Sequence, residues 1–298
     1  MSAVLVEAGP DAGAVWHFGE PTKEQRALAA GLAWADLSHH EIISITGEDR
    51  LTWLHSLTTQ HLENLTPGQW QQALILDPQG HIEHQFNLVD DGTTTWLVLD
   101  PGRASALLEH LQKMKFMLRV DVRDVSGEFA ILRAPGATDD LGGPYALVPH
   151  AELPAMKETF STIATQVGTW ALDAERVAAG RPRIGFETDH KSIPNEIGLL
   201  NKAVHMNKGC YRGQETVAKI ANLGNPPRRL VLLHLDGSVV TIPAAGAAVE
   251  KDGVKVGFIG TVARHHELGT IALAVVKRST PMDAELTVDG IPATQEDI

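Results

Sequence analysis

The chain carries one cysteine, and its neighbours are of types that could make it reactive. Cys210 lies at a predicted loop-to-helix junction and is bracketed by two glycines. Lys208 precedes it by two residues and Arg212 follows it by two, so in an extended segment the three side chains point to one side. Two cations and the positive end of a helix beginning near Gln214 would favour the thiolate. The alternative, which the spacing alone favours, is that Cys210 is a small buried hydrophobic residue and the glycines only form a turn.

The cysteine belongs to a basic segment of an acidic chain. Lys and Arg number 25 and Asp and Glu 37, giving a formal net charge of -12. Between Asn201 and Leu230, six basic residues accompany one acidic residue, Glu215. Direct nucleic-acid binding is not expected of a uniformly acidic surface, but this segment would attract a carboxylate-bearing cofactor or a phosphate. The alternative is a solvated basic face without a ligand.

The histidines form three clusters, and none has the spacing of a common metal motif. Adjacent residues on a strand point to opposite faces, which makes His39-His40 and His265-His266 poor chelates. In His81–His84, only His81 and the glutamate would share a face. A single cysteine also excludes a thiolate-only metal or cluster site. The sequence therefore predicts no metal site, and it lacks P-loop, G-x-G-x-x-G and G-x-S-x-G motifs.

Hydrophobic periodicity predicts a mixed α/β chain with a β-rich end. Hydrophobic residues make up 43% and charged residues 21%, enough for a sizeable core. Helices are expected at Lys23–Trp34, Arg50–Thr59, Ala104–Met114, Leu153–Thr165 and Gln214–Asn222. Gly180–Asn207 shows no periodicity, and irregular segments of this length are usually functional or disordered. After Asn225, short strands indicate a small terminal β-barrel or sandwich; they are Leu230–Leu235, Ala247–Glu250, Val254–Ile259, Gly260–Arg264, Thr270–Val276 and Ala284–Val288.

Targeting and membrane signals are not expected. Met1–Pro10 has no basic start and only a short apolar run, which differs from a signal peptide. No stretch reaches the roughly 18 apolar residues of a membrane span. With one cysteine and no possible internal disulfide, the sequence favours a reducing, cytoplasmic location.

Residues Lys208–Glu215 spell K-G-C-Y-R-G-Q-E, which resembles the K-G-C-Y-x-G-Q-E signature of the YgfZ family. That family lies within the glycine cleavage T-protein (aminomethyltransferase) superfamily. The resemblance covers nearly the whole chain. Further matches are Gly31–Ser38, Ile45–Asp49, Pro67–Gln69, the Gly80 turn, Ser192–Glu196 and Val254–Thr261.

The resemblance implies an α+β fold. Two interleaved mixed α/β, ferredoxin-like subdomains would surround a central cavity over residues 1–225, followed by an antiparallel β-barrel over residues 226–298. It implies tetrahydrofolate, or a folate-like small molecule, as cofactor. It also implies iron–sulfur client proteins as partners, with a role in cluster assembly or repair and thereby in tRNA modification. The implied reactive residues are Cys210, Lys208 and Arg212, and the implied cofactor-binding or loop-fixing residues are Tyr211, Gln214, Glu215, Glu196 and Arg176.

Two positions depart from the aminomethyltransferase pattern. His84 stands where those enzymes carry a catalytic aspartate, and imidazole cannot replace a carboxylate that stabilises a cation. Ala178 stands where the superfamily anchors folate with a glutamate, for which Glu196 or Glu187 could substitute. The alternative function, a folate-dependent aminomethyltransferase or demethylase, therefore lacks its carboxylate. A third alternative is a folate-binding or orphan scaffold in which Cys210 is only structural.

Overall fold

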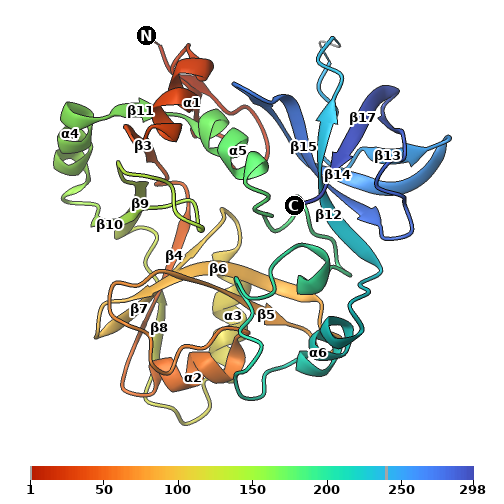
Figure 1. Ribbon diagram of the computed structural model, residues 1–298. Helices are drawn as coiled ribbons and strands as arrows, with labels where there is room; N and C mark the ends of the chain where they lie inside the picture. Colours follow the sequence, from red (N-terminus) through yellow and green to blue (C-terminus); the bar gives the residue numbers. More distant parts are fainter. Residues whose placement is uncertain (1, 239–240) are drawn as a thin grey trace. The chain divides into compact units, whose positions relative to one another are not determined.

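The computed structural model describes residues 2–238 and 241–298 (Figure 1). The expectation for Met1–Pro10 is only partly covered, because Met1 lies outside the described residues. The chain forms two compact units. The first contains the residues up to Ile75, His84–Leu172 and Asn207–Tyr211. The second contains Leu76–Glu83, Asp173–Met206 and the described residues of Arg212–Ile298.

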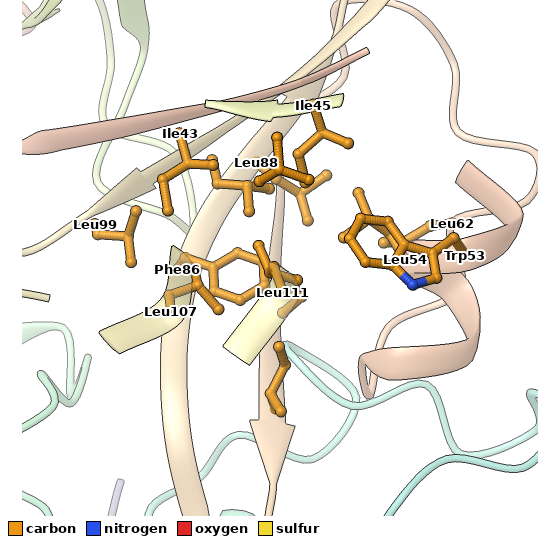
Figure 2. Close-up of a cluster of buried hydrophobic side chains, with 14 of the residues drawn as sticks. Ile43, Ile45, Trp53, Leu54, Leu62, Phe86, Leu88, Leu99, Leu107 and Leu111 are labelled. Carbon is orange, nitrogen blue, oxygen red and sulfur yellow. The ribbon is translucent and has the colours of Figure 1, made fainter. Parts of the chain in front are cut away.

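The larger sheet has the strand order β5-β6-β7-β4-β8. Its strands are β4 (Glu41–Thr46), β5 (Gln71–Leu76), β6 (Ile82–Asp90), β7 (Thr94–Leu99) and β8 (Asp121–Asp124). Helices α2 (Arg50–Leu57) and α3 (Ala104–Met114) belong to the same core. Figure 2 shows Ile43, Leu88 and Leu99 of the sheet together with Leu107 and Leu111, which lie one turn apart on α3. This spacing gives α3 the apolar face that the sequence pattern predicts.

The smaller sheet of the first unit has the order β10-β9-β3-β11. Its strands are β3 (Ala33–Asp36), β9 (Phe129–Arg133), β10 (Tyr145–Pro149) and β11 (Thr165–Val167). Nearby elements are β1 (Val4–Leu5), β2 (Val15–His17), α1 (Pro21–Ala29), α4 (Leu153–Ile163) and α5 (Thr169–Ala178).

The helix predicted over Lys23–Trp34 is wrong at its end. Helix α1 stops at Ala29, and Trp34 is a buried residue of strand β3. Gly31 explains the stop, because its φ of +72° breaks the helix and a side chain there would press on the backbone of Gly136 and Ala137.

The C-terminal strands close into a barrel in the order β12-β15-β14-β13-β16-β17. They are β12 (Arg228–Leu235), β13 (Ala248–Lys251), β14 (Val254–His265), β15 (Gly269–Lys277), β16 (Leu286–Val288) and β17 (Ile291–Glu296). The predicted mixed α/β class and terminal antiparallel β-barrel are therefore confirmed. The predicted strands Val254–Ile259 and Gly260–Arg264 are instead one long strand, β14, with an irregular pairing between Ile259 and Val262. The sequence does not predict strand β17, because half of its residues are polar and it contains Pro292.

Between α5 and the barrel the chain is largely irregular, as the sequence predicts. The 3-10 turn η1 (Pro194–Glu196) and helix α6 (Gln214–Leu223) lie in this part. In the part of the chain that the structure describes, no helix has both the length and the apolar character of a membrane crossing. The central cavity and the boundary between residues 225 and 226 stay predictions.

Candidate functional site

The cysteine motif reverses the usual burial of its residue types. Lys208 is only 7% exposed and Tyr211 8%, whereas Cys210 between them is exposed. Free cysteines are among the most buried residues of proteins and lysines among the least. The buried-cysteine alternative is therefore wrong. The loop holds its lysine and tyrosine inside and leaves the thiol at the surface.

Lys208 closes the end of helix α2. Its ammonium donates hydrogen bonds to the carbonyl oxygens of His55, Thr58 and Gln60, the last at 3.0 Å. The last carbonyls of a helix have no partner within the helix, and a cation at this end also interacts favourably with the helix dipole. Burial lowers the pKa of Lys208 to about 8, and Glu63 acts in the opposite direction.

Tyr211 is the second anchor of the loop. Burial raises the pKa of its phenol to about 12, so the side chain is neutral at physiological pH. The Lys208 ammonium lies 5.3 Å from the centre of the ring, within the range of a cation–π interaction. Both residues fix the backbone on either side of Gly209 and Cys210.

The motif's second glycine is required by close backbone packing. Gly213 has a φ of +82° at the start of α6, and a Cβ there would lie 2.6 Å from the carbonyl oxygen of Asp77. It would also lie 2.8 Å from the Cα of Gly80, whose own Cβ would press on Thr216. The Gly80 turn and the first turn of α6 thus pack against each other through two glycines. The sequence identifies both glycines but not their contact.

Arg212 is the first residue of the cysteine motif that belongs to the second unit. Its guanidinium forms an ion pair with Glu83 at 3.2 Å, and both side chains are partly exposed. Gln214 and Glu215 occupy the first turn of α6, where the negative charge of Glu215 suits the helix dipole. The sequence assigns Lys208 and Arg212 to the thiol. In the structure their charged atoms contact carbonyl groups and Glu83, so their role at the thiol stays a prediction.

Arg176 and Glu187 form a buried pair in the second unit. Glu187 is fully buried; it accepts hydrogen bonds from the amides of Thr261 and Arg183, at 2.7 and 2.8 Å, and from Arg176 at 3.2 Å. Arg176 also donates to the Thr261 hydroxyl and to the carbonyl oxygen of Arg181. A Cβ at Gly260 would overlap the Glu187 carboxylate, which explains the glycine in strand β14.

Glu196 belongs to a second buried ion pair. Arg228 donates to its two carboxylate oxygens at 2.9 and 2.7 Å, a bidentate geometry. The same guanidinium binds Asp189 at 2.7 and 3.1 Å. Burial alone would raise the pKa of Asp189, but the hydrogen bonds from Arg228 and its neighbours lower it well below the usual range. The sequence places Arg228 only in the basic segment and gives no sign of this double pairing.

His84 lies on β6 in the first unit, beside a second histidine. Burial lowers its pKa to about 4, and the charges of His110 and Arg103 act in the same direction. The two imidazole rings are 5.6 Å apart between centroids. At physiological pH His84 is therefore a neutral imidazole.

Comparison with known proteins shows which proteins this chain resembles. Residues 5–138 match the GCVT N-terminal domain family. The tRNA-modifying protein YgfZ of Colwellia psychrerythraea is 22% identical over 231 residues, covering 67% of this chain and 70% of that protein. The chain is therefore similar, at low identity, to YgfZ and to other proteins with a GCVT domain. The YgfZ-type motif around Cys210 lies outside the residues that match this domain.

Two further relatives and one solved structure extend the comparison. A putative chloroplastic transferase of Arabidopsis thaliana is 26% identical over 288 residues, covering 82% of this chain and 65% of that protein. A mitochondrial iron-sulfur cluster assembly factor IBA57 homolog of Phaeosphaeria nodorum is 24% identical over 269 residues, covering 77% and 62%. The chain thus spans a little under two thirds of these two relatives. The glycine cleavage system aminomethyltransferase T of Bartonella henselae superimposes with a TM-score of 0.83 at 18% identity, covering 98% of this chain and 92% of that one, which establishes the shared fold.

Proposed function

We propose that this YgfZ-type protein maintains iron–sulfur enzymes, supporting assembly or repair of their clusters and thereby tRNA modification. The observation that carries the proposal is the exposed Cys210 in a loop whose lysine and tyrosine are buried. An exposed thiol in a well-fixed loop can coordinate iron as the thiolate, which a buried thiol cannot. The names of the YgfZ and IBA57 relatives support the same function.

Cys210 supplies one ligand and a partner supplies the others. Protein-bound iron–sulfur clusters are held by several thiolates, and this chain has a single cysteine. The thiolate therefore makes a transient coordination bond to iron, with its proton passing to solvent, while a client protein supplies the other ligands. A reducing, cytoplasmic compartment would keep such an exposed thiol in its reactive form.

The single cysteine also makes the test direct. Iodoacetamide should alkylate Cys210 in the folded protein, and mass spectrometry then reports one site without ambiguity. In cells that lack this protein, Cys210→Ala should fold normally by circular dichroism yet fail to restore iron–sulfur enzyme activity and cluster-dependent tRNA methylthiolation. Lys219→Ala, at an exposed position on α6, is the control and should restore both. Full restoration by Cys210→Ala, or alkylation only after unfolding, would refute the proposal.

Tetrahydrofolate is expected to bind weakly. The two carboxylates that could replace the anchoring glutamate do not fit that role, because Glu187 and Glu196 already engage their oxygens with Arg176 and Arg228. Losing one charge-assisted pair costs about 1.5–3 kcal/mol, roughly ten- to a hundredfold in affinity. Calorimetry should therefore detect tighter binding by Ala178→Glu than by the unchanged protein. Nanomolar binding by the unchanged protein, with no gain in the variant, would contradict this expectation.

The aminomethyltransferase alternative is not favoured by the site. A neutral, buried His84 cannot offer the negative charge that a developing iminium cation requires. Purified protein given tetrahydrofolate and an aminomethylated carrier should therefore release no ammonia above background. Turnover that Cys210→Ala leaves unchanged would favour the alternative.

A further inference from the structure

His39 and His40 lie in a turn, which brings their side chains together. The amide of His40 donates to the carbonyl oxygen of Leu37 at 2.9 Å. Just before it, the amide of Ser38 donates to Asp36 at 3.0 Å. The two imidazole rings are 4.8 Å apart between centroids and inclined at 69°. The sequence-based argument that adjacent histidines point apart assumes a strand, and it fails here because the strand β3 ends at Asp36.

A buried carboxylate from the N-terminal segment completes the cluster. Asp11 is 9% exposed and lies in a turn in which the amide of Ala14 donates to its carbonyl oxygen at 2.9 Å. Its Oδ1 lies 3.2 Å from Nε2 of His39. That nitrogen is buried, and apart from this ion-pair contact it makes no hydrogen bond with any residue that the structure describes. One ligand atom from each of Asp11, His39 and His40 can be chosen so that all lie within 4.8 Å of one another.

We propose that Asp11, His39 and His40 bind a divalent transition-metal ion of the Zn²⁺ and Fe²⁺ class. Metal bonds of about 2.1 Å in tetrahedral geometry place ligand atoms about 3.4 Å apart, so small side-chain rotations bring the three within bonding distance. Two imidazoles and one carboxylate suit borderline ions of this class, whereas Mg²⁺ and Ca²⁺ prefer oxygen ligands. Three protein ligands leave a coordination position for water or another molecule. The ion would also fasten the N-terminal segment to the turn after β3.

A second histidine cluster in the same unit is a weaker metal site. His55, His61 and Glu63 also place ligand atoms within 4.8 Å of one another. The amide of Leu62, however, donates to Nδ1 of His55 at 3.2 Å, so the proton of the neutral ring sits on Nε2. Neither nitrogen of His55 then offers a lone pair without losing that hydrogen bond. The ammonium of Lys208 lies against the same segment and opposes a second cation.

The test is metal binding by chelator-treated, full-length protein carrying Cys210→Ser, which removes the thiol as a competing ligand. Titration with Zn²⁺ in a calorimeter, and with Co²⁺ by its visible absorption, should give one equivalent bound with a dissociation constant of about 1 μM or tighter. Asp11→Asn and His39→Gln should each weaken binding at least about tenfold. His61→Gln, in the second cluster, is the matched control and should bind as the parent does. Circular dichroism of each metal-free variant checks that it is folded.

Failure to bind either ion with one-to-one stoichiometry below roughly 100 μM would overturn the proposal. So would binding that persists in the Asp11→Asn/His39→Gln double variant and is lost in His61→Gln, because the ion then occupies the second cluster. These outcomes are independent of the function of Cys210, since the thiol is absent from every protein tested.

Discussion

Lys208 is the residue whose role differs most from what its type suggests. It is buried, and its ammonium supplies hydrogen bonds to three carbonyl groups at the end of α2. Lys208→Met keeps the apolar stem but leaves those carbonyls without donors, so the free energy of unfolding should fall by roughly 2–4 kcal/mol. Urea denaturation measures this loss. Lys219→Met, at an exposed position, is the control and should stay within about 0.5 kcal/mol of the parent. Equal stability of the two variants would show that Lys208 does not cap the helix.

His84 should make the protein less stable in weak acid. Its pKa is about 4 in the folded protein, lowered by burial and by the charges of His110 and Arg103, against about 6.5 when unfolded. Between these values the unfolded chain binds a proton that folded His84 does not, so stability falls as the pH drops from about 6.5 towards 4. The loss is on the order of 3 kcal/mol.

The variant His84→Gln tests this dependence. Urea denaturation at a series of pH values should show a flatter decline between pH 6.5 and 4, with up to about one proton fewer taken up on unfolding. His150→Gln, at an exposed position, should keep the slope of the parent. An unchanged slope in His84→Gln would contradict the assignment.

At the scale of the elements, helix α6 provides a comparison between its two terminal glycines. Gly213 and Gly224 both have positive φ, at +82° and +66°. A methyl group at Gly213 would also collide with Asp77 and Gly80, whereas nothing lies within 4 Å of one at Gly224. Gly224→Ala should therefore cost only the backbone strain, about 1–2 kcal/mol, and Gly213→Ala roughly 3 kcal/mol or more. Thermal and urea unfolding of the two variants measure the difference. If the two variants lose the same free energy of unfolding, the packing of Gly213 against Gly80 does not explain the need for glycine at position 213.

At the scale of the whole molecule, Arg228 joins the irregular segment before the barrel to the barrel itself, within the second unit. Its guanidinium binds Glu196 and Asp189 through separate hydrogen bonds from strand β12. Lysine keeps the charge but cannot make both bidentate pairs. In Arg228→Lys we expect amide hydrogen exchange across residues 183–206 to accelerate at least about tenfold. This corresponds to a decrease of about 1.4 kcal/mol or more in the free energy of local unfolding. Arg278→Lys, at an exposed position, should leave that exchange unchanged. Unchanged exchange in Arg228→Lys would show that other contacts hold the segment.

Local patterns in the sequence determined much of the fold. Helix α3 has the predicted bounds, and α6 ends one residue later than predicted. These elements carry their signal within one or two turns of chain: an apolar face for α3 and flanking glycines for α6. The short apolar strands after Asn225 also predicted the terminal barrel. The sequence by itself also singled out Cys210, because one cysteine between cations and glycines is visible without any structure.

The tertiary structure alone decided what surrounds these residues. Lys208 is buried against the end of helix α2, some 150 residues earlier in the sequence. There its ammonium donates hydrogen bonds to the carbonyl oxygens of His55 and Thr58. Glu196 pairs with Arg228 across 32 residues. His39 and His40 meet Asp11 only because their segment turns instead of continuing as a strand. A sequence pattern reports the period of one segment, whereas burial, ion pairing and ligand geometry depend on which distant segments come together, and this is set by packing.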